Sequence, residues 1–154
     1  MDETRWLDDE ERAAWLSLIG VTLRLPTALD AQLQRDAGVT HFDYLVLAML
    51  SESADRTLTM SELAARASSS LSRLSHVVAK LEKRGWITRR PSRQDRRTTI
   101  ARLTDDGVAA IVAAAPLHVE RVRSLVFDAL TPAEVGQLAR IGTKVLGRLD
   151  PQPR

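Results

Sequence analysis

Residues 70–103 have the sequence SLSRLSHVVAKLEKRGWITRRPSRQDRRTTIARL, and this stretch decides the fold. Its first half places apolar side chains at the i, i+3, i+4 and i+7 spacing of a helix face, which predicts a helix over residues 71–84. Gly85 is suited to a left-handed helix stop. Two segments with β-branched residues, 86–90 and 98–103, then flank a polar turn and predict a β-hairpin.

The same stretch is basic, although the whole chain is almost neutral. The 154 residues include 22 Lys plus Arg and 20 Asp plus Glu, a formal net charge of +2. Residues 73–102, the basic block, hold ten basic and two acidic side chains, which leaves +8 here and −6 on the other 124 residues. Such segregation is typical of a surface that meets nucleic-acid phosphates. The alternative is a solvated charged face.

The composition excludes several classes of protein. The chain has no cysteine, which rules out disulfides, thiol chemistry and cysteine-ligated metal sites. Charges interrupt every apolar run before it reaches the roughly 18 residues of a membrane span. The acidic start, Met1-Asp2-Glu3, is unlike a secretory signal, so we expect a cytoplasmic protein without a membrane segment. Phosphate-binding, H-E-x-x-H and G-x-S-x-G motifs are missing, so we expect neither an enzyme nor a cofactor.

Long helices are predicted at both ends of the chain. Residues 8–36 carry two apolar stripes, more than one small core uses, and Gly38 is expected to end this helix. A second long helix is predicted over 105–129 and a last one after the cap Thr131. Bends are expected at Pro26 and Pro116.

Shorter elements fill the middle of the chain. Thr40 is placed to cap an apolar helix over 41–51, and the polar residues 52–58 are expected to form a loop. A capping box, Thr59 to Glu62, then starts a short helix that precedes a turn of serines. The expected fold is mainly α (α+β), with a winged helix-turn-helix.

This order of elements suggests how the basic block would meet DNA. The helix after Ser70 would enter the major groove, and the arginines of the hairpin tip would enter a minor groove. Leu71, at the start of this helix, would either contact a thymine methyl or pack. The candidate DNA-binding residues are Ser70, Ser72, Arg73, Ser75, His76, Lys80, Arg93, Asp95, Arg96 and Arg97.

The sequence resembles the MarR (multiple antibiotic resistance regulator) family of bacterial transcription regulators over residues 10–148. The motifs that carry this resemblance are Ser61-Glu62-Leu63-Ala64, Leu81-Glu82-Lys83-Arg84-Gly85-Trp86-Ile87, Arg89-Arg90, Asp95-Arg96-Arg97, Leu103-Thr104-Asp105-Asp106-Gly107 and Phe127-Asp128-Ala129-Leu130-Thr131.

The resemblance implies a homodimer whose helical regions, 1–36 and 105–154, dimerise while residues 37–104 bind double-stranded DNA. It implies that Arg97 reaches the minor groove, that Asp95 braces Arg97, and that the dimer binds a pseudo-palindrome. Most members repress transcription and release DNA when a small phenolic or other amphipathic anion binds.

His41 and Tyr44 lie where effector pockets of this family often form, and Trp15 could face the same cavity, although core or dimer packing is the favoured explanation for all three. Two alternatives remain. One is an effector-independent DNA-binding or architectural protein. The other is a metal-dependent regulator acting through His41 or His118, although the spacing of the three histidines shows no metal site and we expect none.

Overall fold

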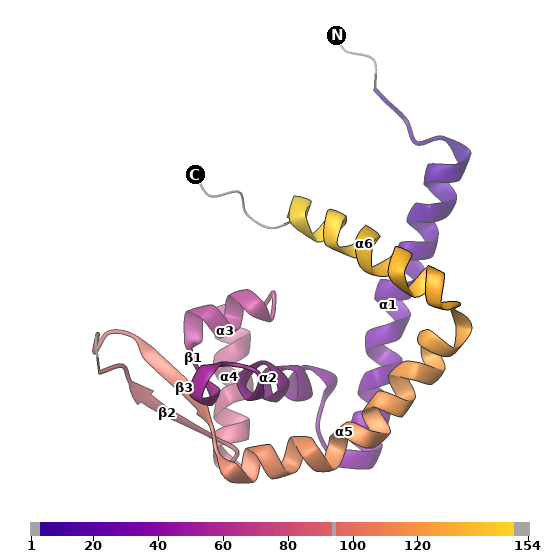
Figure 1. The fold of residues 1–154 in the computed structure, drawn as a ribbon. Coiled ribbons are helices and arrows are strands. Elements are labelled where there is room, and N and C mark those ends of the chain that lie inside the picture. The colour runs from indigo at the N-terminus through magenta and orange to yellow at the C-terminus, as the bar shows by residue number, and fades with distance from the viewer. Residues whose placement is uncertain (1–3, 94, 150–154) are drawn as a thin grey trace. The chain divides into compact units, whose positions relative to one another are not determined.

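The computed structural model describes residues 4–93 and 95–149 of the chain (Figure 1). It divides into two compact units, residues 1–118 and residues 119–154. The helices are α1 (Asp9–Ala37), α2 (His41–Ser51), η1 (Ala54–Arg56), α3 (Met60–Arg66), α4 (Leu71–Lys83), α5 (Asp105–Leu125), η2 (Phe127–Ala129) and α6 (Pro132–Leu149). The strands are β1 (Thr57–Thr59), β2 (Ile87–Pro91) and β3 (Thr99–Leu103).

Local signals explain where the first helices begin and end. Asp8 accepts from the amide of Glu11 at 2.8 Å, and the Glu11 carboxylate accepts from the amide of Asp8 at 3.1 Å, which forms a capping box. Helix α1 continues through Pro26 and stops at Gly38, whose φ of 64° confirms the predicted left-handed end. Thr40 caps α2, as predicted.

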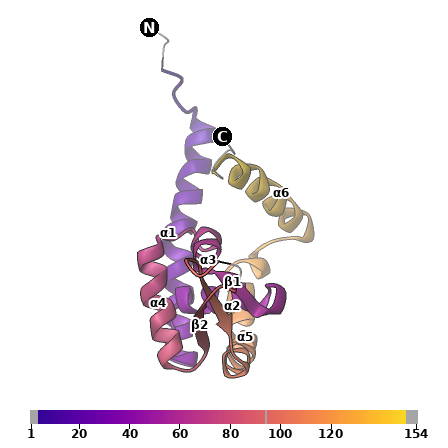
Figure 2. The ribbon, with the colours of Figure 1, turned by 90° about the vertical axis from the view of Figure 1, so that its left-hand side faces the viewer.

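The sheet has three antiparallel strands in the order β1-β3-β2. Ile87 of β2 pairs with Leu103 of β3, and Leu58 of β1 pairs with Ala101. In Figure 1 the β2–β3 hairpin extends beyond the short helices, and in Figure 2 it faces the viewer with α4 to its left. This arrangement of α3, α4 and hairpin confirms the winged helix-turn-helix prediction.

Strand β1 corrects one prediction. We expected residues 52–58 to form a loop, whereas η1 and then β1 occupy this segment. A strand of three residues is too short to show the alternation of apolar and polar side chains by which strands are predicted. It exists because its backbone pairs with β3 and because Leu58 is buried between two half-buried threonines.

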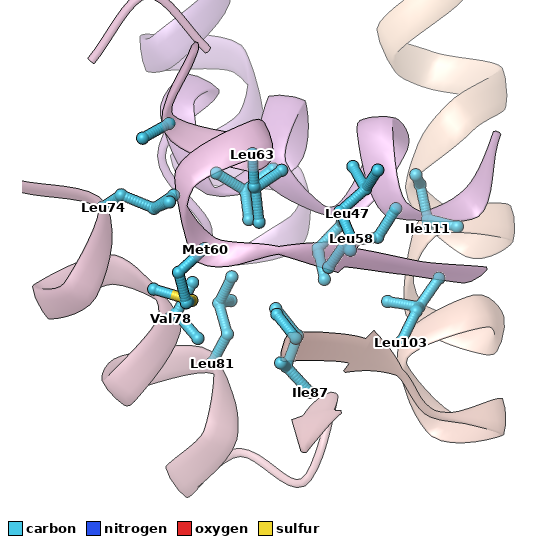
Figure 3. Close-up of a cluster of buried hydrophobic side chains, with 14 residues drawn as sticks. Leu47, Leu58, Met60, Leu63, Leu74, Val78, Leu81, Ile87, Leu103 and Ile111 are labelled. Atoms are coloured by element: carbon cyan, nitrogen blue, oxygen red, sulfur yellow. The ribbon is translucent and has the colours of Figure 1, made fainter. Parts of the chain in front are cut away.

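The core of the first unit lies between the short helices and the sheet. Figure 3 shows the side chains of α2, α3 and α4 converging on those of the strands and of Ile111 from the start of α5. Leu63, Leu74, Val78 and Leu81 are completely buried. The buried stripe of α4 therefore fixes which of its faces remains exposed.

The connection between the hairpin and α5 is closely packed and is held by Thr104. The amide of Thr104 donates to the carbonyl of Trp86 at 3.0 Å, and its hydroxyl donates to the carbonyl of Gly85 at 2.7 Å. The same hydroxyl accepts from the amide of Gly107 at 3.1 Å and so caps α5. A Cβ at Gly107 would lie 2.3 Å from the carbonyl oxygen of Trp86, which explains the glycine.

The second unit contains the last residues of α5, then η2 and α6. Helix α5 ends at Leu125 and not at the predicted residue 129, because the chain changes to the 3₁₀ turn η2 after Val126 leaves the helical conformation. The Thr131 hydroxyl and the Glu134 carboxylate form the predicted capping box of α6. No described residue of α6 is buried. Five large apolar side chains of this helix are exposed in the single chain: Leu138, Ile141, Val145, Leu146 and Leu149.

Candidate nucleic-acid interface

Helix α4 presents a polar face opposite its buried stripe. Because residues advance by about 100° around a helix, the residues between the buried leucines and valine point away from the core. Ser72, Arg73, His76 and Lys80 are exposed there, and Ser75 is half-buried. Ser70 precedes the helix as its cap, and its hydroxyl accepts from the amide of Arg73 at 3.2 Å. A serine hydroxyl that accepts one hydrogen bond in this way can also donate one.

Lys80 has a partner inside the protein. Its ammonium lies 2.5 Å from Oδ2 of Asp43 on α2, a carboxylate with no exposed surface. The same oxygen accepts from the amide of Thr40 at 2.8 Å, while Oδ1 of Asp43 has no hydrogen-bond partner among the described residues. Asp43 therefore needs Lys80 to balance its buried charge.

Two arginines, one at each end of α4, connect this helix to residues of other elements. The guanidinium of Arg73 lies 4.4 Å from the ring centroid of Phe42, in cation–π geometry. Arg84, at the other end of α4, donates to the carbonyl of Gly38 at 2.9 Å and lies 5.0 Å from the ring centroid of Trp86. Contacts at both ends of α4 thus orient its polar face.

Glu82, the acidic residue of α4, is neutralised by Arg89 of β2. The Arg89 guanidinium donates two hydrogen bonds to Oε2, at 2.7 and 3.0 Å, and its amide donates to Oε1 at 3.0 Å. The hydrogen bonds from the Arg89 side chain are the main cause that lowers the pKa of Glu82. This pair also ties α4 to the hairpin. Sequence reasoning missed it because Glu82 lies on a helix and Arg89 on the strand that follows the turn at Gly85, so the pair does not show the i, i+3 or i, i+4 spacing of a helical ion pair.

The wing, residues 91–98, carries the predicted arginines on its surface. Arg93, Arg96 and Arg97 are exposed and form no ion pair within the part of the chain that the structure describes. Asp95 accepts from the amide of Arg97 at 3.0 Å and from the hydroxyl of Thr98 at 2.9 Å. These two hydrogen bonds, in that order, lower the pKa of Asp95. Asp95 thus holds the backbone at Arg97 and leaves its guanidinium free.

The start of α4 and the wing share one hollow of about 260 Å³. Its lining combines hydroxyl groups and guanidinium groups with two apolar side chains. The lining residues are Met60, Ser61, Leu71, Ser75, Arg89, Arg97, Thr98 and Thr99. Candidate residues that are 22 positions apart in the sequence, Ser75 and Arg97, therefore face the same space.

A second polar cluster lies where α1, α2 and α5 meet. The ring of His118 lies 4.3 Å from the ring centroid of Tyr44 and 5.9 Å from that of His41, and its Nδ1 is 3.1 Å from Oε1 of Gln32. Nδ1 of His41 is buried without a hydrogen-bond partner among the described residues. Burial is the main cause that lowers the pKa of both histidines, and burial raises the pKa of Tyr44.

Two of the three predicted effector residues, His41 and Tyr44, belong to this cluster. The third, Trp15, is half-exposed on α1, 17 residues before Gln32. At 1.5 Å per helical residue this is about 25 Å along the axis, so one chain does not bring Trp15 to the cluster. Sequence reasoning considered His118 only as a metal ligand and did not identify Gln32, because contacts between residues 86 positions apart leave no local pattern.

In residues 4–93 and 95–149, no three His, Asp or Glu side chains are grouped so that they could hold a metal ion. Within the same ranges, no helix combines the length and the apolar character that crossing a bilayer requires.

Known proteins that resemble this chain in sequence and structure are transcription regulators. The sequence model of the MarR family matches residues 37–98, the segment from the end of α1 to the wing. The transcriptional repressor MprA of Escherichia coli (strain K12) is 33% identical over 113 residues. That match covers 73% of this chain but only 64% of MprA, so the chain spans less than two thirds of this relative.

Two solved structures match over nearly the full length. Sco3205, a MarR family transcriptional regulator from Streptomyces coelicolor determined in complex with DNA, is 46% identical, with a TM-score of 0.92 over 99% of this chain and 95% of that chain. AbsC, a MarR family regulator from the same organism, is 36% identical, with a TM-score of 0.89 over 97% of this chain and 100% of that chain.

Proposed function

The chain belongs to the MarR family, and from this premise we propose that it is a cytoplasmic transcription regulator that binds double-stranded DNA sequence-specifically. The observation that carries this proposal is the hollow shared by Ser75 of α4 and Arg97 of the wing. A helix in a major groove and a hairpin in the neighbouring minor groove must lie side by side in this way. Sco3205, the 46% identical relative, was crystallised with DNA.

The charges of this surface support the same proposal. The two acidic side chains of the basic block, Glu82 and Asp95, are both engaged in hydrogen bonds within the protein. The exposed arginines of the wing form no ion pair among the described residues, so their charge is available to phosphates or to a minor groove.

We further propose that the protein acts as a homodimer through residues 1–36 and 105–154. Apolar side chains on α1, α5 and α6 remain exposed in the single chain, including Trp15, Leu23, Val112, Leu117 and Ile141. Faces of this kind are costly in water and mark protein–protein contacts. A two-fold dimer would bind half-sites about one helical turn apart in a pseudo-palindromic operator.

The cluster of His41, Tyr44 and His118 is the proposed effector site, and a small phenolic or amphipathic anion is the proposed effector of a repressor. The neighbouring rings, and Nδ1 of His41 with no hydrogen-bond partner among the described residues, would suit an aromatic ligand with one polar group. A phenolic anion such as salicylate should then weaken operator binding at fixed salt. If no such anion does, an effector-independent regulator is the better description.

The test of DNA binding is selection of duplexes from a random pool with the purified protein, followed by sequencing. We expect enrichment of a two-fold symmetric site, and an affinity that falls steeply with salt as phosphate contacts require. The matched control is a variant in which Arg93, Arg96 and Arg97 are all replaced by Ala. A pool without an enriched sequence, or equal selection by the control, would contradict the proposal.

A further inference from the structure

Leu71 differs from the other apolar residues of α4. It stands three positions before Leu74 and so continues the stripe that Leu74, Val78 and Leu81 form in the core. Those three residues are completely buried, whereas Leu71 is 50% exposed. The core therefore ends before it reaches Leu71, and packing accounts for only part of this side chain.

The surroundings of Leu71 are polar and basic. It follows three consecutive serines and precedes a fourth, and it lines the hollow together with Ser75 and Arg97. Met60, the other apolar residue of the hollow, is only 7% exposed. Leu71 is therefore the exposed apolar group among those that line this hollow.

A DNA duplex offers few apolar groups to such a side chain. Phosphates and the hydrogen-bonding edges of bases are polar, whereas the 5-methyl group of thymine is apolar and projects into the major groove. The basic charge around Leu71 favours a duplex over an apolar protein surface, because phosphates are attracted to Arg97 and its neighbours. Polar neighbours such as Ser72 can form hydrogen bonds to bases or phosphates, but they cannot replace an apolar contact.

We propose that Leu71 determines part of the sequence specificity by contacting the 5-methyl group of a thymine in the major groove. This inference rests on the proposed function, since it assumes that α4 enters that groove. Ser75, which lines the same hollow one helical turn later, would lie beside the same or the next base pair.

The experiment uses the full chain and the duplex most enriched by selection, with each thymine replaced in turn by uracil. Uracil pairs as thymine does but lacks the methyl group. Binding of the unaltered protein should weaken about fourfold for each half-site at one position, the effect of one buried methyl group. The variant Leu71→Ala should bind the thymine and uracil duplexes equally. The control Glu52→Ala changes an exposed residue at the end of α2 that does not line the hollow, and it should keep the preference for thymine.

The outcomes distinguish this inference from the proposed function. Specific binding of the unaltered protein without a thymine preference at any position would overturn the role of Leu71 alone. A preference that Leu71→Ala retains would overturn it as well. Failure of the unaltered protein to select any duplex would overturn the proposed function and this inference together. Thermal unfolding of Leu71→Ala provides the folding control, and its half-exposed position predicts a folded variant.

Discussion

Lys80 of α4 forms an ion pair with Asp43 of α2, across 37 positions of sequence, and the Asp43 carboxylate is completely buried. The pair joins the helix that is proposed to enter DNA to the helix that carries His41 and Tyr44. Successive residues of α2 turn by about 100°, so Phe42 and Asp43 face α4 while His41 and Tyr44 face His118. The first turn of α2 thus contacts the helix that is proposed to enter DNA and contributes two residues to the proposed effector site.

The ion pair makes a prediction about stability. Lys80→Met leaves a buried carboxylate without its counter-charge and should lower the free energy of unfolding by about 3 kcal/mol, the low end for a broken buried pair because Lys80 is half-exposed. Urea unfolding followed by circular dichroism measures the change. The double variant Lys80→Met/Asp43→Asn removes both charges and should recover part of the loss. No recovery would show that the two side chains are not coupled.

The wing makes a prediction about affinity. Arg97→Ala should weaken binding of the selected operator by about 1–3 kcal/mol, because the proposed contact of its guanidinium with the groove is lost. Fluorescence anisotropy at fixed salt measures the affinity. The control is Arg12→Ala, which removes an arginine paired with Asp9 at the start of α1. Equal affinities of the Arg97 variant and the unaltered protein would contradict the placement of the wing.

Local signals in the sequence predicted most of the fold and much of the site. Capping boxes, Gly38 and the apolar stripe of α4 determine the helix boundaries through contacts within a few residues, so their patterns were sufficient. Strand β1 and the pair of Asp43 with Lys80 depend on contacts between distant segments. A buried aspartate in a capping box looks the same in sequence as an exposed one, and so the role of Lys80 could not be predicted.

The junction after the hairpin makes a prediction about packing. Gly107→Ala places a methyl group against the carbonyl of Trp86 and the side chain of Leu103, and it should destabilise the fold by about 1–3 kcal/mol. Gly147→Ala, on the face of α6 opposite its apolar side chains, is the control, since apart from its chain neighbours and the nearby backbone of its own helix no atom lies within 4 Å of the added Cβ, and helix propensity favours alanine. Urea unfolding compares the two variants. Equal stability of both would contradict the close approach at Gly107.

The histidine cluster makes a prediction about pH. His41 and His118 have folded-state pKa values below 6.5, so as the pH falls the unfolded chain binds protons before the folded chain does. The free energy of unfolding should therefore decrease as the pH falls below about 6.5, and it should level off at the lower pH where the folded histidines also become protonated. The carboxylates with lowered pKa values change the free energy of unfolding only below about pH 4.5, where they begin to be protonated, and so they do not affect it at the pH where the histidines titrate.

Unfolding midpoints in urea across this pH range measure the effect. Asp30 near His41 opposes the lowering of its pKa, so the slope should steepen in Asp30→Asn. The double variant His41→Gln/His118→Gln should have a nearly flat profile from pH 6.5 to 5. A profile that this double variant shares with the unaltered protein would contradict the assignment.

The apolar face of α6 makes a prediction about assembly. Leu138, Val145 and Leu149 lie within about 40° of one another on the helix and are exposed in the single chain. Leu138→Glu places a charge in the proposed dimer contact and should shift the protein to monomers, because an unpaired charge is costly in an apolar interface. Analytical ultracentrifugation measures the shift. Arg140→Glu, which changes charge on the opposite face of α6, should leave the dimer intact, and dissociation by both variants alike would contradict a contact specific to the apolar face.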